Sequence, residues 1–287
     1  MRVALSGSHG LVGSALARHL SGRGDDVVPL SRGPYTARHV AGFDAVVHLG
    51  GASVGGRRWN ESYKQELRRS RIESTAALAA AIAGLDDARP ALLTASAIGY
   101  YGADAGSGPR TETDAPGTDF LARLCVDWEE AAEPARLAGA RVVHARFGIV
   151  LSAAGGVLAR QLPLFRAGVG GRIGPGTQYQ SWVSRRDVVS ALVHLMTDPG
   201  ASGPYNVTAP EPLTNAEMTR ALARALHRPA VVPLPAFALR LALGREMAEV
   251  VPLSGQRVLP ARLQEAGFGF ADPELGSGLA TALSDRS

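Results

Sequence analysis

The chain has 287 residues, of which 46% are hydrophobic and 20% are charged, and these proportions are typical of a globular protein and exclude wholesale disorder. The formal net charge is +4, Lys64 is the only lysine, and no block of five like charges occurs, so we expect no nucleic-acid partner. The apolar stretches are shorter than the roughly 18 residues that a membrane span needs, so we expect no membrane partner. Cys125 is the only cysteine, which, with no signal peptide, favours a cytoplasmic location.

The first half of the sequence alternates between strand-like and helix-like patterns. Short apolar runs predict strands over residues 3–5, 27–30, 43–49, 91–97 and 141–151. Apolar residues at helical spacing predict helices over residues 11–20, 61–83 and 120–138. This alternation is typical of an α/β protein of the Rossmann type, in which helices cover both faces of a doubly wound parallel sheet.

After residue 151 the alternation ends, and the remaining sequence predicts a smaller C-terminal substrate lobe. Helices are expected over residues 187–196, from the capping box Thr214-x-x-Glu217 to about residue 226, and over residues 237–251. We expect a Rossmann domain over residues 1–232, with interleaved substrate-lobe segments at about 152–182 and 209–232. Residues 233–287 are expected to form a small helical C-terminal domain.

A glycine motif lies between the first predicted strand and the first predicted helix. Gly7, Gly10 and Gly13 follow one another at three-residue spacing. In a dinucleotide-binding fold the first glycine permits a tight turn, the second lets the backbone approach a pyrophosphate, and the third lets the helix pack close to the sheet. The first helical residues, Leu11 and Val12, then offer free N–H groups at the positive end of the helix dipole. The motif predicts a nicotinamide dinucleotide site.

The end of the second predicted strand bears on the choice between NAD(H) and NADP(H). An NAD site of this kind usually carries an acidic residue there, to accept a hydrogen bond from the ribose 2′-hydroxyl. Here the strand ends in Leu30-Ser31-Arg32, and a hydroxyl with a guanidinium suits a 2′-phosphate. We therefore expect NADP(H) as the cofactor, with Ser31 and Arg32 contacting it. The alternative is that Arg32 is a solvated loop residue.

Two further motifs follow predicted strands: His48-Leu49-Gly50-Gly51 and Ser96-x-x-x-Tyr100-Tyr101-Gly102. Together with the glycine motif they resemble the extended short-chain dehydrogenases/reductases of the epimerase/dehydratase branch. Longer strings, such as Gly148-Ile149-Val150-Leu151 and Ser181-Trp182-Val183, are similar to an atypical subfamily of epimerase-family proteins described as nucleoside-diphosphate-sugar epimerases. The tail resembles the C-terminal domain of unknown function found with them. The resemblance implies a nicotinamide cofactor and an oxidoreductase or epimerase activity.

The sequence departs from this family at the usual proton relay. Active extended members carry a Tyr-x-x-x-Lys pair on the helix after the serine-bearing strand, but residues 120–138 contain neither tyrosine nor lysine. Alignment on Glu129 places Leu121 and Cys125 at the two positions. Ser96 corresponds to the serine of the family, with Ala97 as an equal alternative. The helical spacing of Leu121, Cys125 and Trp128 predicts that Cys125 belongs to the core.

Another proton donor is therefore needed for hydride transfer. A positioned general acid contributes roughly 10²–10⁴-fold in rate. Tyr100 and Tyr101 follow a central strand at its carboxyl end, where ligands collect in open α/β sheets. We expect Ser96, Tyr100 and Tyr101 to be the catalytic residues. The alternative is that the two tyrosines are a packing pair in a loop.

Five more residues are expected near the cofactor from their places in the fold. Leu49 and Gly50 end the third strand and should border the adenosine and the pyrophosphate. Arg71 is expected to reach a phosphate or ribose and Glu66 to accept from a hydroxyl, whereas a solvated helix face is the alternative for both. Val150 lies where such folds place backbone near the nicotinamide.

Two functions remain open. The first is an NADP(H)-dependent oxidoreductase or epimerase with a non-standard proton donor and an unidentified small-molecule substrate. The second is a non-catalytic NADP(H)-binding module that reports redox state to a partner. Leu121 and Cys125 at the relay positions favour the second, and the retained substrate lobe favours the first. The seven histidines lack metal-ligand spacing, so no metal site is expected, and an oligomer remains possible.

Overall fold

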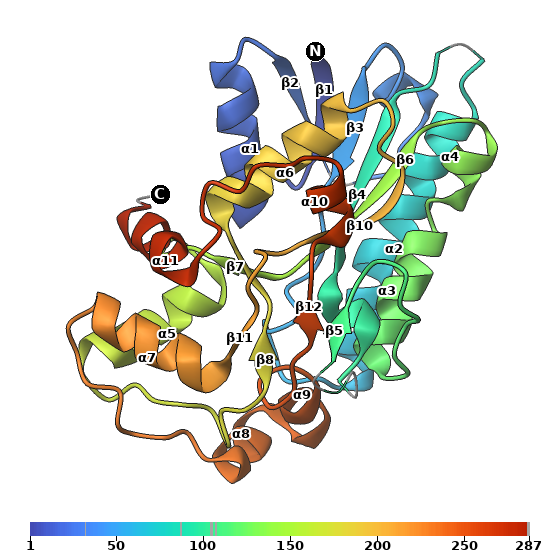
Figure 1. The fold of residues 1–287 in the computed structure, drawn as a ribbon. Helices are drawn as coiled ribbons and strands as arrows, with labels where there is room; N and C mark the ends of the chain where they lie inside the picture. Colours follow the sequence, from blue (N-terminus) through green and yellow to red (C-terminus); the bar gives the residue numbers. More distant parts are fainter. Residues whose placement is uncertain (32, 87, 104–105, 107, 286–287) are drawn as a thin grey trace. The chain divides into compact units, whose positions relative to one another are not determined.

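The structure, a computed structural model, describes residues 1–31, 33–86, 88–103, 106 and 108–285. The chain divides into two compact units, whose elements are labelled in Figure 1. Unit 1 comprises residues 1–97, 123–146 and 189–205, and unit 2 comprises residues 98–122, 147–188 and the chain from residue 206 onward. Each unit is therefore assembled from three separate stretches of the sequence.

Unit 1 is built on a six-stranded sheet in the order β10-β6-β4-β3-β1-β2. Its strands are β1 (Arg2–Ser6), β2 (Asp26–Leu30), β3 (Ala45–His48), β4 (Ala91–Ala97), β6 (Val142–Phe147) and β10 (Gly203–Val207). Strand β1 pairs in parallel with β2 and with β3, and β3 pairs in parallel with β4. In this register Ser6 lies opposite both Leu30 and His48. The carboxyl ends of three parallel strands therefore meet at one edge of the sheet, as the sequence predicts.

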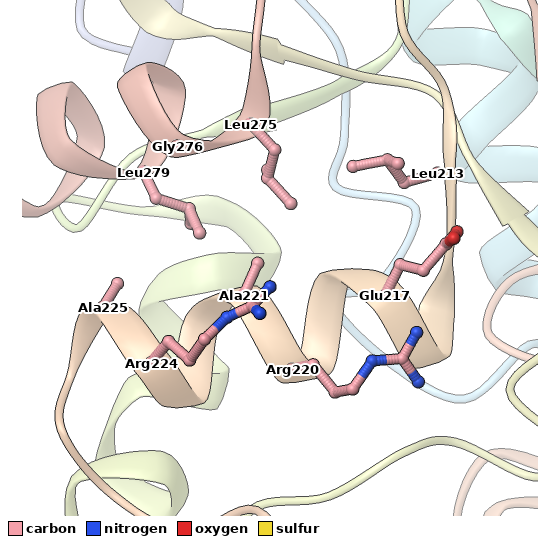
Figure 2. Close-up of a pocket in the computed structure, with 9 residues that line it drawn as sticks. All are labelled: Leu213, Glu217, Arg220, Ala221, Arg224, Ala225, Leu275, Gly276 and Leu279. Carbon is pink, nitrogen blue, oxygen red and sulfur yellow. The ribbon is translucent and has the colours of Figure 1, made fainter.

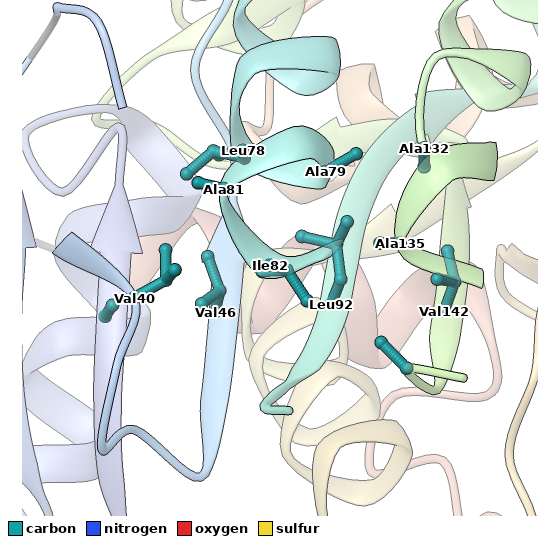
Figure 3. Packing of buried hydrophobic residues seen from close by; sticks show 12 residues of the cluster. Val40, Val46, Leu78, Ala79, Ala81, Ile82, Leu92, Ala132, Ala135 and Val142 are labelled. Carbon is teal, nitrogen blue, oxygen red and sulfur yellow. The ribbon is translucent and has the colours of Figure 1, made fainter. Parts of the chain in front are cut away.

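Helices cover both faces of this sheet. They are α1 (Leu11–Gly22), α2 (Glu61–Ala83), α3 (Phe120–Glu130), α4 (Glu133–Leu137) and α6 (Arg185–Thr197), with a short 3₁₀ turn η1 (Ala37–His39). On one face, Val46 and Leu92 of the sheet pack with Leu78 and Ile82 of α2 (Figure 3). Val3 and Leu5 alternate to the other face and are also fully buried, because successive strand residues point to opposite sides. The predicted α/β fold of the Rossmann type is confirmed.

Unit 2 is made of short elements. In the part that the structure describes, the two-stranded sheets pair β7 (Ile149–Leu151) with β9 (Trp182–Ser184), β8 (Tyr179–Gln180) with β11 (Leu213–Thr214), and β5 (Pro109–Arg110) with β12 (Arg257–Val258). The helical segments are η2 (Ile98–Tyr101), α5 (Gly156–Arg166), α7 (Asn215–Ala225), α8 (Ala236–Leu243), α9 (Arg245–Val250), α10 (Ala261–Glu265) and α11 (Leu275–Ser284). The core centres on Trp182, which is fully buried and donates from Nε1 to the carbonyl of Glu211.

Three elements predicted as continuous are broken, and those predictions are wrong. The helix expected over residues 120–138 divides into α3 and α4, because Pro134 lies in the first turn of α4 and has no N–H to continue a helix. The strand expected over residues 141–151 divides at Gly148, where a Cβ would lie 2.5 Å from the carbonyl oxygen of Ser181. The helix expected over residues 237–251 divides at Gly244, whose φ of +84° ends α8.

The sequence does not predict several elements, among them β10, α5 and α11. Strand β10 begins with Gly203 and Pro204, which resemble a turn, and α5 begins after Gly155 and contains Pro163. Helix α11 contains Gly278, where a Cβ would lie 2.2 Å from the Trp182 ring. These elements depend on contacts with distant parts of the sequence. No helix in the described ranges is long and apolar enough to cross a membrane.

Candidate functional site

The glycine loop between β1 and α1 has the geometry of a dinucleotide cradle. Gly7 has a φ of +79°, and its carbonyl accepts the N–H of Gly10 at 2.9 Å. A Cβ on Gly13 would lie 2.1 Å from the Gly7 oxygen, and a Cβ on Gly7 would lie 2.8 Å from the Leu49 carbonyl carbon. Side chains at Gly7 and Gly13 would therefore fill the space that the loop needs, as the motif requires.

The first turn of α1 stays available to an anion. The helix begins at Leu11 with Gly10 as its N-cap, no side chain caps it, and its first turn carries no acidic residue. The N–H groups of Leu11, Val12 and Gly13 thus lie at a helix end that has a positive dipole and no competing carboxylate. This end of α1 fits the pyrophosphate of a dinucleotide.

A hollow of about 410 Å³ lies beside the cradle at the carboxyl ends of β1 and β3. Its lining includes two of the predicted cofactor residues, Gly50 and Glu66. Glu66 also forms an ion pair with Arg57 at 3.3 Å. The remaining lining residues are Ser6, Gly33, Tyr35, His48, Gly51, Ala52, Ser53, Tyr63, Arg69, Ser70 and Ser74. Gly50 and Glu66 thus lie at one cavity of unit 1, whereas the predicted residues Leu49 and Arg71 are not part of its lining.

His48 forms a buried hydrogen-bond network beneath this hollow, which the sequence analysis did not identify. Its Nδ1 lies 2.8 Å from the Ser6 hydroxyl and its Nε2 lies 3.0 Å from the Ser74 hydroxyl. Ser74 donates its own proton to the carbonyl of Ser70 at 2.8 Å, so Nε2 of His48 carries the ring proton and Nδ1 accepts from Ser6. Burial, with a contribution from Arg71, lowers the pKa of His48 to about 4. The imidazole is therefore neutral at physiological pH.

Arg71 lies behind the loop that follows β3. Its side chain is buried, its Nη2 donates to the carbonyl of Ala52 at 2.9 Å, and its guanidinium lies 5.0 Å from the Trp128 ring centre. Burial lowers the pKa of the guanidinium. Among the described residues no carboxylate pairs with it. The Gly51 Cα lies beside Arg71, since a Cβ there would be 3.3 Å from Cζ, so Arg71 supports the floor of the hollow.

The end of β2 gives less information about the nucleotide. Ser31 follows β2 and is exposed. Arg32 lies outside the described residues. The expected contact of Ser31 and Arg32 with a 2′-phosphate therefore stays a prediction.

Ser96, at the end of β4, belongs to a buried ion-pair network. Its hydroxyl donates to Oε1 of Glu129 at 2.6 Å, and both oxygens of Glu129 accept from Arg146, at 2.8 Å each. Arg146 and Ser96 are each 2% exposed. A bidentate pair of this kind has a fixed geometry, so the Ser96 hydroxyl is held toward α3. In the sequence alone, Glu129 is recognisable only as an alignment position.

Helix α3 has no proton donor at the relay positions. Cys125 is buried, which confirms the prediction that it belongs to the core. Burial raises the pKa of its thiol to about 12, with a smaller contribution from Glu129. The thiol is therefore protonated and unreactive at physiological pH.

Tyr100 and Tyr101 lie in η2, in unit 2. Their rings are in edge contact, with centroids 5.3 Å apart. Tyr101 is 3% exposed, and its hydroxyl donates to Oδ1 of Asn206 at 2.7 Å. Asn206 is held in turn by the carbonyl of Leu259 at 3.0 Å. The Tyr101 hydroxyl is thus anchored in the interior, whereas Tyr100 is only partly buried. Val150 is also in unit 2, paired with Val183 of β9.

A larger hollow, of about 760 Å³, lies between α7 and α11 in unit 2 (Figure 2). Its leucines Leu275 and Leu279 are already buried, at 6% and 1% exposure, and its arginines Arg220 and Arg224 are exposed. A ligand there would gain little apolar contact and would meet no convergent set of buried polar groups. The smaller hollow beside the glycine cradle is therefore the better candidate for a binding site.

Comparison with known proteins identifies the family. Residues 3–208 match the model of the NAD dependent epimerase/dehydratase family. The chain belongs to this family. Residues 234–282 match a domain of unknown function, DUF1731, close to the expected start of the C-terminal domain at residue 233.

Relatives within this epimerase family match almost the whole chain. The epimerase family protein Mb2239 of Mycobacterium bovis is 45% identical over 297 residues, which cover 98% of this chain and 97% of that protein. The human epimerase family protein SDR39U1 is 35% identical over 294 residues, covering 97% and 98%. A crystal structure of human SDR39U1 (isoform2) with NADPH superposes with a TM-score of 0.91 and 32% identity, over 100% of both chains.

Proposed function

We propose that this protein is an NADP(H)-dependent oxidoreductase or epimerase of the short-chain dehydrogenase/reductase type, acting on a small molecule in the cytoplasm. The observation that carries the proposal is the glycine cradle at α1, where side chains at Gly7 and Gly13 would collide with backbone. The human relative with NADPH supports the choice of nucleotide. The buried, unpaired thiol of Cys125 fits a reducing compartment.

Different residues of unit 1 would hold the pyrophosphate and the adenosine of the nucleotide. The N–H groups at Leu11, Val12 and Gly13 would bind the pyrophosphate. The hollow lined by Gly50 and Glu66 would accept the adenosine, with Glu66 positioned to accept from a ribose hydroxyl. Arg71, which has no carboxylate partner among the described residues, would place a positive charge beneath these groups. Bound NADPH would supply a hydride to a carbonyl.

The proton must come from a side chain other than a Tyr-x-x-x-Lys pair. Leu121 cannot donate, and Cys125 is buried with a raised pKa. Tyr101 already gives its proton to Asn206, and Ser96 gives its proton to Glu129. Of the three predicted catalytic residues, we favour Tyr100 as the donor, because its side chain is the most exposed.

The cofactor proposal is tested by titrating cofactor-free protein with NADPH and with NADH while following nicotinamide fluorescence. We expect saturable binding of NADPH and affinity for NADH that is weaker by about tenfold, equivalent to roughly 1.4 kcal/mol. Arg32→Ala should remove this preference. Arg38→Ala is the control, because it removes an exposed arginine six residues further along the chain, and this variant should keep the preference. Equal affinity for both nucleotides would exclude NADP(H) selection, and absence of binding would exclude the site.

A second function is favoured by α3 itself. A helix that carries Leu121 and a buried Cys125 at the relay positions suits a protein that binds NADP(H) without turnover and reports redox state. The two functions differ in one measurement. An enzyme consumes NADPH when a panel of carbonyl compounds is added, whereas a sensor binds NADPH and leaves its absorbance unchanged in every case.

A further inference from the structure

Unit 2 exposes a group of large apolar side chains. Val231 is 75% exposed, Phe237 is 71% exposed and Leu241 is 79% exposed. Three more, Val169, Val232 and Leu234, are between 39% and 50% exposed. We call these six residues the apolar patch. Single exposed apolar residues are ordinary, but a group of this kind marks an interaction surface.

The residues of the apolar patch lie on adjoining segments. Val169 forms a bridge with Ala230, and Ile173 forms a bridge with Leu234. The N–H of Val232 donates to the carbonyl of Gly170 at 3.3 Å. The segment 169–173 therefore lies against the segment 230–234, and α8 (Figure 1) begins two residues later at Ala236.

Helix α8 is apolar at seven of its eight positions. Its sequence is AFALRLAL, in which Arg240 is the only polar residue. Leu239 is buried, whereas Phe237 and Leu241, one turn apart, are exposed on another side. A helix with apolar residues on nearly every side is normally buried in protein or in lipid. With eight residues, α8 is about 12 Å long, so it could lie in a membrane interface but could not span a bilayer.

The segments that form the apolar patch are rich in arginine. Residues 157–172 contain three arginines and no acidic residue, and residues 218–245 contain five arginines and no acidic residue. Of these, Arg240 of α8 pairs with Glu249 at 2.7 Å. Arg166, Arg172 and Arg228 are exposed and form no ion pair with a carboxylate in the part of the chain that the structure describes. The patch is therefore flanked by cations that remain free to meet an anionic partner.

This charge distribution decides between a second copy of the chain and an anionic surface. In a two-fold dimer the same patch occurs on both sides of the interface, so Arg166, Arg172 and Arg228 would face a surface that carries the same three cations. An anionic phospholipid surface instead offers phosphates to the arginines and hydrocarbon to Phe237 and Leu241. Lipid also accepts protruding side chains without a complementary groove.

We propose that the apolar patch docks the protein peripherally on an anionic phospholipid membrane, with Phe237 and Leu241 inserted and Arg166, Arg172 and Arg228 at the headgroups. The sequence alone predicts no membrane partner, because its apolar stretches are too short to span a bilayer. The sequence does not reveal that α8 is exposed. This exposure supports peripheral binding to the membrane surface, which needs no spanning segment. This proposal does not depend on the cofactor or on turnover.

The test is co-sedimentation of the full chain with vesicles of phosphatidylcholine alone and vesicles that also contain phosphatidylglycerol. We expect binding only to the anionic vesicles, weakened by added NaCl because the Debye length falls to about 3 Å at 1 M salt. The double variant Phe237→Ser, Leu241→Ser should bind at least about tenfold less, since two large side chains no longer enter the lipid. The double variant Arg172→Gln, Arg228→Gln should lose the preference for anionic vesicles.

The matched control is Leu137→Ser, because Leu137 is 72% exposed but lies in unit 1. It should bind vesicles as the unaltered protein does. Circular dichroism and thermal unfolding identify any variant that is misfolded. If the Phe237/Leu241 variant is misfolded, the Arg172/Arg228 variant tests the proposal in its place. The proposal is overturned if anionic vesicles leave the protein in the supernatant or if the Phe237/Leu241 variant binds them unchanged. It is also overturned if sedimentation equilibrium shows a dimer that this variant dissociates and that vesicles do not bind.

Discussion

At the scale of single residues, the buried His48 makes the stability of the fold depend on pH. His48 is 1% exposed and neutral; its Nε2 donates to the Ser74 hydroxyl and its Nδ1 accepts from the Ser6 hydroxyl. In the unfolded chain a histidine has a pKa near 6.5, whereas in the folded protein burial lowers the pKa of His48 to about 4. The unfolded state therefore binds a proton between these two values, and the folded state does not.

From this difference we predict that stability decreases as the pH falls through the window from about 6.5 to 4. The contribution of His48 is absent above this window and reaches about 2 kcal/mol at pH 5, when one proton is bound by the unfolded state alone. His48→Gln should remove that part of the loss, because glutamine can donate and accept but does not titrate. The measurement is the urea midpoint at pH 5 and pH 7.5. His19→Gln, at an exposed position of α1, is the control and should behave as the unaltered protein.

The two tyrosines of η2 should respond differently to replacement by phenylalanine. Tyr101→Phe removes the hydrogen bond to Asn206 and leaves a buried acceptor unpaired, which should cost about 1–3 kcal/mol of unfolding free energy. Tyr100→Phe should change stability little. If Tyr100 is the proton donor, its loss should lower NADPH oxidation by about 10²-fold or more, whereas Tyr101→Phe should retain most activity. Full turnover in Tyr100→Phe would assign the donor elsewhere.

At the scale of elements, helix α1 contains two glycines in different surroundings. Gly13 and Gly22 are both glycines of this helix, but a Cβ on Gly13 would lie 2.1 Å from the Gly7 oxygen, whereas a Cβ on Gly22 would have no atom within 4 Å. The same substitution therefore has opposite consequences at the two positions.

We predict that Gly22→Ala stabilises the protein by up to about 1 kcal/mol, because alanine loses less backbone entropy than glycine in a helix. NADPH affinity should not change. Gly13→Ala should push α1 away from the loop and should lower both stability and NADPH affinity. Thermal unfolding and fluorescence titration of the two variants measure this. Equal affinities for NADPH in both variants would mean that close packing of α1 is not needed for binding.

The predictability of the elements follows from where their stabilising contacts lie. The glycine motif could be predicted because its contacts join residues within one turn and one helix. The network at His48 joins residues that are 42 and 26 positions apart, and the network at Ser96 joins residues 33 positions apart. No local pattern marks such partners. The breaks at Pro134 and Gly244 were visible in the sequence but were outweighed by helical periodicity on both sides.

At the scale of the whole molecule, the second half of the chain is also hard to predict from local sequence patterns. Strands β5, β8, β11 and β12 each have two residues, which is too short for an alternating pattern. Helix α11 is rich in small residues because Gly278 must approach the Trp182 ring. In unit 1, by contrast, β1, β3, β4 and β6 are largely buried, so the sequence displays them as mostly apolar runs.

The C-terminal segment is attached to the rest of unit 2 by Asp187. Its carboxylate accepts the N–H groups of Ala271 and Asp272, at 2.9 Å each. Burial raises the pKa of Asp187. Arg185, two residues earlier, pairs with Asp285. The start of α6 therefore holds both the beginning and the end of the segment that contains α11.

We predict that Asp187→Ala opens residues 271–285 to protease. Two N–H groups would lose their acceptor. The loss should cost about 1–3 kcal/mol at Asp272, which is buried, and less at Ala271, which is exposed, so local opening would become more frequent. Limited proteolysis followed by mass spectrometry should show new cuts in this segment. Asp26→Ala, at an exposed position of β2, should give the cleavage pattern of the unaltered protein. An intact segment in Asp187→Ala would show that other contacts suffice to hold it.

The order of strands in unit 1 has a consequence for how the protein is made. Strand β10 is at the edge of the sheet next to β6, yet it is encoded at residues 203–207, some sixty residues after β6. Because a ribosome adds about 5–20 residues per second, a nascent chain carries β6 as an open edge for several seconds before its neighbour exists. An open edge is a template for pairing with other chains. Synthesis rate and chaperone access over residues 147–203 should therefore influence the yield of soluble protein more than the same delay introduced after residue 207.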